Sequence, residues 1–343
     1  MAEFDALLFV SFGGPEKPDD VMPFLRRVVA GRNVPDERLQ VVAEHYHHFG
    51  GKSPINDQNR ALIAAIEQDF AAHDVKLPVY FGNRNWHPLL PDTLREMKAA
   101  GVRRALAFFT SAYSSYSGCR QYRENIAAAQ AEVEGAPEIV FLRRFFNHPG
   151  FVEANVERAK EALGSLTDLQ RAGVRLVFTA HSVPMSMART SRYEEQLREM
   201  ARLVAEAVGV TEWDLVWQSR SGPPQIPWLE PDILDHLKAS TDREDRPSAV
   251  VISPIGFVSD HMEVVYDLDH EAKELAEELG LPMVRAKTAG THPAFVQMVR
   301  HLVEEYTQEK QPLAVGNLAP KPMPCGEDCC PRPARPGRPK PSA

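Results

Sequence analysis

This sequence of 343 residues has no long hydrophobic run, only four cysteines and no excess of positive charge. It contains no run of about eighteen apolar residues, which argues against a membrane-spanning helix. The net charge is −8, whereas general nucleic-acid binders usually carry a basic face. Four cysteines are too few for a disulfide framework. The sequence therefore predicts no nucleic-acid partner and at most peripheral contact with a membrane.

The motifs of several large enzyme classes are also missing. There is no G-x-x-x-x-G-K-[ST], no G-x-G-x-x-G after a strand, no H-E-x-x-H and no G-x-S-x-G. Phosphoryl transfer, nicotinamide chemistry and serine hydrolysis therefore lack their usual signatures. The N-terminal residues, Met-Ala-Glu-Phe-Asp, lack the basic start and apolar core of a secretion signal, which predicts a cytoplasmic protein.

Short β-rich runs alternate with longer stretches of helical spacing along the chain. Hydrophobic residues make up 43% and charged residues 25%, as is usual for a globular chain large enough for two cores. Strands are predicted at 6–11, 78–82, 105–110, 138–142, 175–180, 215–218, 249–252 and 283–286. Helices are predicted at 59–72, 92–100, 120–134, 150–165, 191–208, 230–239, 259–279 and 292–308. This alternation predicts an α/β protein whose parallel sheets are covered by helices on both faces.

The first strand region has an echo in the second half of the chain. Residues 7–15 (LLFVSFGGP) resemble residues 176–184 (LVFTAHSVP) in their apolar strand, ring, turn and proline. We therefore predict two similar halves, at 1–169 and 170–319, with a cleft between them. Ligands of open α/β sheets bind beyond the carboxyl ends of the strands. A Pro-rich, cysteine-bearing tail at 320–343 is predicted to be disordered after residue 330.

Three carboxylates follow the strand predicted at 249–252. Glu263, Asp267 and Glu271 are spaced four residues apart, which on a helix places them on one face. Oxygen ligands in such a line could accept protons or pass a hydrated divalent cation inward. A solvated acidic face explains the spacing equally well, so the pattern alone leaves both interpretations open.

A histidine follows the strand predicted at 175–180. His181 could act at a site because imidazole both binds borderline metals and exchanges protons near neutral pH. A lone histidine is nevertheless more often a structural hydrogen-bonding residue. Since His181 and Glu263 both follow strands of the same half, they could face each other across one pocket, around a metal or a labile N–H.

The cysteines are unevenly placed. Cys325, Cys329 and Cys330 lie within six residues, while Cys119 stands alone in mid-chain. In a reducing compartment structural disulfides are disfavoured. Clustered thiolates then point first to a metal or an iron–sulfur cluster.

Six segments of the chain together form a recognisable set. They are residues 9–15 (FVSFGGP), 50–54 (GGKSP), 82–88 (GNRNWHP), 178–184 (FTAHSVP), 217–229 (WQSRSGPPQIPWL) and 254–263 (PIGFVSDHME). In this order they resemble the ferrochelatases, the enzymes that insert ferrous iron into a porphyrin. The resemblance covers roughly residues 5–310 and implies two Rossmann-like halves around a porphyrin cleft, in agreement with the two halves expected from the strand pattern.

The resemblance also implies roles for individual residues. His181 is similar to the catalytic histidine and Glu263 to the glutamate facing it, both on one side of the macrocycle. His181 is expected to accept a pyrrole proton and contact the iron, with Glu263 as its partner. Asp267 and Glu271 match an acidic route for metal or protons.

Further positions match the substrate-binding residues of the family. Ser53 and Tyr122 are similar to residues that contact substrate carboxylates in bacterial members. Phe12 stands where many bacterial relatives carry a tyrosine facing the iron, and a phenyl ring cannot ligate. His45 stands where some relatives have an arginine.

The cysteine set matches that of some family members, including actinobacterial ones, which hold a [2Fe–2S] cluster. By this resemblance Cys119, Cys325, Cys329 and Cys330 bind a [2Fe–2S] cofactor. Zinc, or an empty redox-sensitive site, remains an alternative because Cys329 and Cys330 are adjacent.

The resemblance as a whole implies a lyase-class metal chelatase of haem and porphyrin biosynthesis, acting as a monomer. Its expected substrates are ferrous iron and coproporphyrin III. Protoporphyrin IX, a cobalt or nickel chelatase, and a non-catalytic tetrapyrrole or metal carrier are the alternatives. Arg26, Arg27 and Arg32 could serve the carboxylates of either porphyrin if they lie near the cleft.

Overall fold

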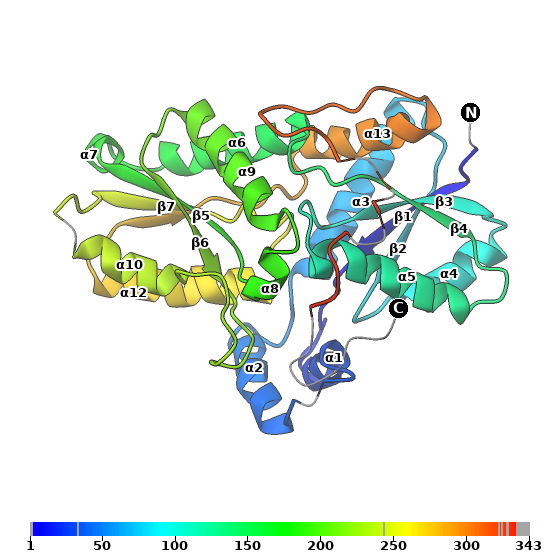
Figure 1. Ribbon diagram of the computed structural model, residues 1–343, viewed down its shortest axis with the longest axis horizontal. Helices are drawn as coiled ribbons and strands as arrows, with labels where there is room; N and C mark the ends of the chain where they lie inside the picture. The colour runs from blue at the N-terminus through cyan, green and yellow to red at the C-terminus, as the bar shows by residue number, and fades with distance from the viewer. Residues whose placement is uncertain are drawn as a thin grey trace.

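The computed structural model describes residues 3–32, 34–242, 244–321, 323, 325–326 and 329–333. Figure 1 shows two α/β halves side by side, each built on a sheet that helices cover. Residues 334–343, most of the segment predicted to be disordered, lie outside the described residues. No described helix is long and apolar enough to cross a membrane.

The two sheets have the same strand order. The first half contains, from one edge to the other, β2 (Val79–Asn83), β1 (Ala6–Ser11), β3 (Arg104–Phe109) and β4 (Glu138–Phe141), all parallel. The second half contains β6 (Trp213–Gln218), β5 (Val174–His181), β7 (Ala249–Ser253) and β8 (Met283–Arg285), also all parallel. In each sheet the first strand of the half pairs with the second and the third. This common order confirms the predicted α/β fold with two similar Rossmann-like halves.

The central strands are buried on both faces, which explains their near-continuous apolar sequences. All residues of β1 and β7 are buried. The main apolar cluster includes Phe9 and Phe108 of the first sheet and Phe178 of the second. Phe295 also belongs to it, with its ring centroid 5.6 Å from that of Phe151. Because one core spans both sheets, the halves are packed against each other.

Two long helices connect the halves. Helix α6 (Pro149–Gly164) packs against α9 (Tyr193–Val208), β7 and β8, which belong to the second half. Helix α13 (Pro293–Thr307) returns to pack against α6 and against α3 (Ile55–Ala72) of the first half. The division of the chain at residue 170 stays a prediction.

Most predicted helices are present, but α1 (Val21–Val28) and α2 (Asp36–His48) and the short segments η1 (Pro18–Asp20), α7 (Asp168–Ala172) and α8 (Met185–Ala188) were not predicted. Helices α1 and α2 extend below the sheets in Figure 1. Only Leu39 and Ala43 of α2 are buried, so its sequence carries little helical periodicity of apolar residues. The other helical segments are α4 (Leu90–Ala99), η2 (Tyr116–Arg120), α5 (Gln121–Ala131) and α10 (Ile233–Thr241).

The helix predicted at 259–279 differs from an ordinary α-helix. It starts as α11 (Met262–Val264), widens into the π-helix η3 (Val265–Ala272) and ends as α12 (Lys273–Glu278). Single π-helical turns inside α-helices are frequent at functional sites. Residue spacing alone did not indicate this widening.

The chain after α13 lies across the seam between the halves. The N–H of Val315 donates to the carbonyl oxygen of Asn147 at 2.9 Å, and Arg143 donates to the carbonyl oxygen of Leu313 at 2.7 Å. The N–H of Asn317 donates to Glu199 of α9. This strap, residues 313–318, is therefore hydrogen-bonded to both halves.

Candidate active site

His181 and Glu263 meet at the carboxyl edge of the second sheet. His181 is the last residue of β5, and Glu263 lies in α11 shortly after β7. The Nε2 atom of His181 lies 3.6 Å from Oε2 of Glu263. Their side chains are 31% and 48% exposed, so both present a free surface to a ligand. The structure thus brings together the two residues expected at the centre of the site.

The electrostatics of this pair favour a charged state. Burial alone would lower the pKa of His181, but the Glu263 carboxylate outweighs burial and raises that pKa to about 9. Burial alone would raise the pKa of Glu263, but the His181 charge lowers it to about 2. Nδ1 of His181 contacts the carbonyl oxygen of Ser182, which fixes the ring orientation. Near neutral pH the free protein therefore holds an imidazolium–carboxylate pair.

Asp267 lies next to Glu263 and is held by two residues that the sequence did not single out. Gln218, the last residue of β6, donates from Nε2 to Oδ2 of Asp267 at 3.3 Å and to the carbonyl oxygen of Glu263 at 3.0 Å. The Ser219 hydroxyl donates to the same carboxylate. Burial raises the pKa of Asp267 to about 7 despite the Ser219 hydrogen bond, and Glu263 and Glu271 add to the rise. Asp267 can therefore exchange a proton near neutral pH.

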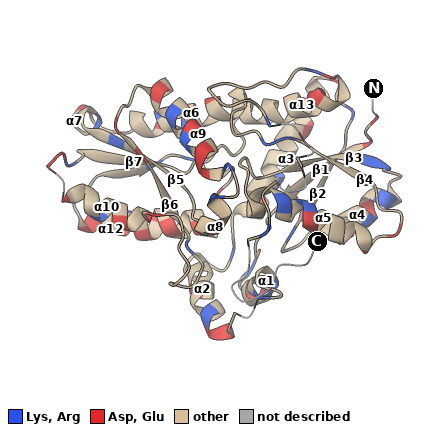
Figure 2. Cartoon of the chain, in the orientation of Figure 1, with Lys and Arg blue, Asp and Glu red and all other residues tan. Residues whose placement is uncertain are grey.

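The outer part of the acidic line is covered by α2. The ring of Tyr266 stacks on that of His45 with centroids 3.7 Å apart. His270 stacks on His48 at 4.2 Å, and its Nδ1 lies 3.0 Å from the Glu274 carboxylate. Partial burial raises the pKa of Glu271. Figure 2 shows that acidic residues continue along α12.

Helices α1 and α2, which were not predicted, bring aromatic rings together with Phe12. Phe24 of α1 lies with its ring centroid 6.2 Å from that of Phe12, 6.0 Å from Tyr46 and 6.2 Å from Trp86. Burial and the charge of Glu263 both raise the pKa of Tyr46. A chain of ring contacts therefore runs from Phe12, at the edge of the first sheet, through the buried Phe24 to Tyr46. The exposed ring of Phe12 suits contact with a flat aromatic ligand.

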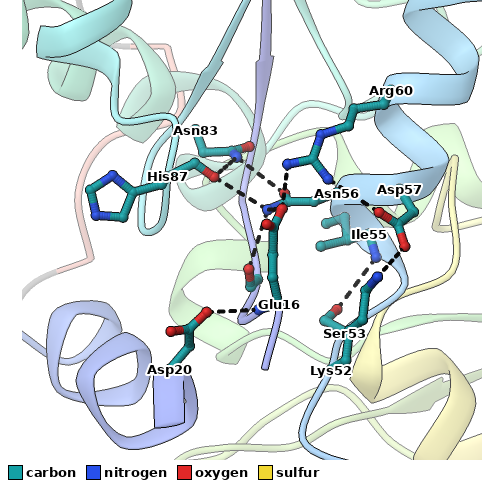
Figure 3. Close-up of polar contacts among 11 residues, drawn as sticks. Glu16, Asp20, Lys52, Ser53, Ile55, Asn56, Asp57, Arg60, Asn83 and His87 are labelled. Atoms are coloured by element: carbon teal, nitrogen blue, oxygen red, sulfur yellow. Dashed lines mark hydrogen bonds and ion pairs between the residues drawn. The ribbon is translucent and has the colours of Figure 1, made fainter. Parts of the chain in front are cut away.

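A buried polar network fixes the loop that carries Ser53, as Figure 3 shows. The side-chain amide of Asn56 donates to Gly14, Glu16 and the backbone of His87, and it accepts from Asn83 at 3.1 Å. Gly14 is required there, because a Cβ atom would lie 2.7 Å from Cβ of Ser53. Ser53 is itself buried, and no described contact joins it to His181.

Tyr122 and Phe12 both contact Arg84. The guanidinium of Arg84 lies 4.3 Å from the Tyr122 ring centroid and 5.6 Å from that of Phe12. Tyr122 also stacks on Phe109 at 4.9 Å. Of the expected substrate-binding residues, Phe12 and Tyr122 are thus brought together, while Ser53 lies in the separate Asn56 network.

The four cysteines form one group of free thiols. Hydrogen bonding from Cys325 lowers the pKa of Cys119 to about 5, and burial raises that of Cys330 to about 12. Sγ of Cys329 lies 3.7 Å from Sγ of Cys330 and 2.8 Å from Nζ of Lys321. Within the described part of the chain, no three or more His, Cys, Asp or Glu side chains have the arrangement of a metal site.

Comparison with known proteins identifies the family. Residues 4–307 match the family described as Ferrochelatase. The chain belongs to the ferrochelatase family. A ferrochelatase from Rhodopirellula baltica is 56% identical over 332 residues, which cover 95% of this chain and 93% of that protein. A coproporphyrin III ferrochelatase from Streptomyces coelicolor is 52% identical over 372 residues, which cover 99% of this chain and 98% of that protein. Another from Frankia alni is 55% identical over 340 residues, which cover 95% of this chain and 86% of that protein.

Solved structures show a related fold at much lower identity. SirB from Bacillus subtilis with Fe3+ matches this ferrochelatase-family chain with a TM-score of 0.57 and 12% identity, over 90% of this chain and 98% of SirB. CbiX, the terminal enzyme for biosynthesis of siroheme in denitrifying bacteria, matches with a TM-score of 0.51 and 16% identity, over 88% and 99% of the two chains. These likenesses confirm the two-half chelatase fold.

Proposed function

We propose that this ferrochelatase-family chain inserts ferrous iron into coproporphyrin III in haem biosynthesis. The observation that carries the proposal is the ion pair of His181 and Glu263, 3.6 Å apart and partly exposed at the carboxyl edge of the second sheet. The exposed ring of Phe12, which packs against Phe24, supports a flat substrate. The names of the Streptomyces and Frankia relatives support coproporphyrin III as that substrate.

The chemistry requires acceptors for protons. When iron enters, the porphyrin loses two pyrrole protons, so the site must accept them while it stabilises a dication. In the free protein His181 is itself protonated, since Glu263 raises its pKa to about 9. Ferrous iron arriving beside Glu263 places positive charge next to the partly exposed imidazolium and favours loss of its proton to solvent. The neutral imidazole then accepts one pyrrole proton.

The second pyrrole proton leaves through the acidic line. Glu263 accepts it from the macrocycle and passes it toward Asp267, whose pKa of about 7 suits a relay at neutral pH. Glu271 is the next carboxylate outward, and Asp267 and Glu271 also form the proposed route of the hydrated iron. Phe12 borders the macrocycle, and Ser53 and Tyr122 contact its carboxylates.

Anaerobic incubation with ferrous iron and each porphyrin tests the proposal. We expect the free-base Soret and Q bands of coproporphyrin III to convert to those of the iron complex, faster than with protoporphyrin IX, cobalt or nickel. His181→Ala should keep porphyrin binding and lose insertion. Faster conversion of protoporphyrin IX would overturn the substrate assignment. Porphyrin binding without any conversion would replace the enzyme with a carrier.

We further propose that Cys119, Cys325, Cys329 and Cys330 hold a [2Fe–2S] cluster. The donor set supports this, because four thiols are what such a cluster requires. Their grouping also fits, with Cys119 in contact with Cys325 and Cys329 beside Cys330. Lys321 places a positive charge 2.8 Å from Cys329, which favours thiolates. When bound, the cluster would supply a redox-active cross-link between Cys119 of η2 and the three C-terminal cysteines.

Spectroscopy of the anaerobically purified protein tests the cluster. We expect thiolate-to-iron charge-transfer absorption and two irons and two sulfides per chain. Cys119→Ser should remove the absorption, whereas the neighbouring Ser117→Ala should keep it. A stoichiometric zinc content without iron, or a metal-free protein after anaerobic purification, would contradict the proposal.

A further inference from the structure

Arg84 is an arginine whose guanidinium lies beside two aromatic rings. It directly follows β2, at the carboxyl edge of the first sheet, and is half-buried. Its Nε donates to Oδ1 of Asn125 at 2.7 Å, and the guanidinium lies over the rings of Tyr122 and Phe12. These contacts fix the orientation of the guanidinium plane without neutralising its charge.

Arg84 differs from other inward arginines in having no carboxylate partner while being partly exposed. Arg143 pairs with Glu305 at 2.8 Å, and Arg300 pairs with Asp69 at 2.8 Å. Arg144 has no carboxylate partner either, but it is buried and donates to the carbonyl oxygens of Ser111 and Gly118. For Arg84, no carboxylate in the described ranges lies within 4.0 Å of its guanidinium. Because Arg84 is partly exposed, an anion from outside the chain can reach its guanidinium and offset the cost of its partial burial.

Arg84 lies beside the exposed ring of Phe12, where the proposed substrate would bind. Phe12 is 37% exposed and is the exposed end of the ring chain that leads through Phe24 to Tyr46. Arg84 therefore stands at the rim of the surface on which a porphyrin would lie, where the peripheral carboxylates of the macrocycle would be. A planar guanidinium can bind a carboxylate through two parallel N–H···O bonds.

We propose that Arg84 is a specificity-determining residue that binds one peripheral carboxylate of the porphyrin substrate. The inference rests on the proposed function, since it takes a carboxylated porphyrin as the ligand. Asn125, Tyr122 and Phe12 act as positioning residues that hold the guanidinium. Binding through Arg84 makes affinity depend on the charge of the porphyrin periphery rather than on its inner nitrogens.

Metal-free porphyrin binding tests this assignment without any turnover. The probes are free-base coproporphyrin III and its tetramethyl ester, which has the same ring and no carboxylates, and the readout is quenching of porphyrin fluorescence. We expect Arg84→Gln to weaken coproporphyrin III binding about tenfold or more, as loss of a charged hydrogen bond does. Its binding of the ester should be unchanged. Arg84→Lys should retain an intermediate affinity because it keeps the charge and loses the planar fork.

Controls separate the charge from the fold. Arg95→Gln, an exposed arginine on α4 paired with Asp92, should leave both affinities unchanged. Thermal unfolding of each variant shows whether it is folded, and if Arg84→Gln is not, Arg84→Lys decides the question. The proposal would be overturned if Arg84→Gln weakened binding of coproporphyrin III and of its tetramethyl ester equally, or if it left binding of coproporphyrin III unchanged. The same outcomes apply to Arg84→Lys if that variant decides.

The outcome is distinguishable from failure of the proposed function. If the wild-type protein binds coproporphyrin III through Arg84 but does not metallate it, the carboxylate site stands and the chelatase function fails. If the protein metallates coproporphyrin III and Arg84→Gln changes neither its affinity nor its KM, the function stands and the assignment of Arg84 fails.

Discussion

Gln58 and Asp260 are joined by two hydrogen bonds, although 202 residues separate them in the chain. The N–H of Asp260 donates to Oε1 of Gln58 at 2.8 Å, and Nε2 of Gln58 donates to the Asp260 carboxylate at 3.4 Å. Gln58 belongs to α3 of the first half, whereas Asp260 lies just before Glu263 in the second. The pair therefore ties the loop that carries Glu263 to the opposite half.

Gln58→Ala removes both bonds at once. We expect a loss of about 1 to 3 kcal/mol in the free energy of unfolding, since one of the two bonds involves a charged acceptor. We also expect a lower kcat, because Glu263 is held less firmly against His181. Urea unfolding and anaerobic insertion kinetics measure the two effects. Gln68→Ala, an exposed position on the same helix, is the matched control, and equal effects of the two variants would contradict this role.

The pH dependence of insertion should follow His181. Its pKa of about 9 means that the free protein is protonated at this residue at pH 7 and loses the proton as pH rises through 9. Since a neutral imidazole is needed to accept a pyrrole proton, kcat/KM for the porphyrin should rise with pH up to about 9. Measurement across pH 6 to 10 under anaerobic conditions checks this.

Glu263→Gln should lower the pKa of His181. Without the carboxylate, burial is the largest influence on His181 and lowers its pKa, while the Ser182 carbonyl and Asp267 still raise it. His181 should then titrate well below its wild-type pKa of about 9, as NMR of its ring protons would show. Glu278→Gln, at the end of α12, should leave the titration of His181 where it is in the wild-type protein. An unshifted His181 in Glu263→Gln would show that the carboxylate is not the cause.

The fold was predictable where the burial of a strand is visible in its local sequence. The strands at β1, β5 and β7 are runs of Val, Leu, Ile and Phe buried on both faces, and such runs are recognisable locally. The sequence did not predict α2 because this helix acts through contacts with residues far away in the chain, which local patterns do not show. Only two of its residues are buried, and its functional side chains, His45 and Tyr46, act on Tyr266 and Glu263 of the other half.

The site was predictable only in part for the same reason. His181 and Glu263 follow strands of one sheet, so their proximity follows from the predicted topology. Gln218 and Arg84 carry no periodic signal, because an amide or a guanidinium at a strand end is ordinary in a sequence. Their importance comes from what they touch: Gln218 holds Asp267, and Arg84 has no carboxylate partner in the described parts of the chain.

Gln218→Met tests that amide contact with Asp267 and with the backbone of Glu263. Methionine nearly matches glutamine in volume but cannot donate a hydrogen bond, so Asp267 loses one of its two side-chain donors. We expect the KM for ferrous iron to rise several-fold, because the carboxylate line is less well oriented. Porphyrin affinity should be unchanged, since Gln218 lies away from the ring chain. Gln225→Met, exposed in the following loop, is the control, and a change confined to porphyrin affinity would contradict this role.

Gly316→Ala should release the strap at 313–318. Gly316 has a φ of +81°, which alone costs an alanine about 1 kcal/mol or more. A Cβ atom there would also meet the Glu199 carboxylate oxygen that accepts from the Asn317 N–H. Gly101→Ala isolates the first cost, because Gly101 has a φ of +80° and open space around its Cβ position. The difference between the two variants is then the cost of displacing Glu199, which overpacking typically sets at about 1 to 3 kcal/mol. Trypsin should cleave Gly316→Ala faster after Lys310 than it cleaves Gly101→Ala. Equal cleavage rates would mean that the hydrogen bonds of Asn147 and Arg143 hold the strap without the contact to Glu199.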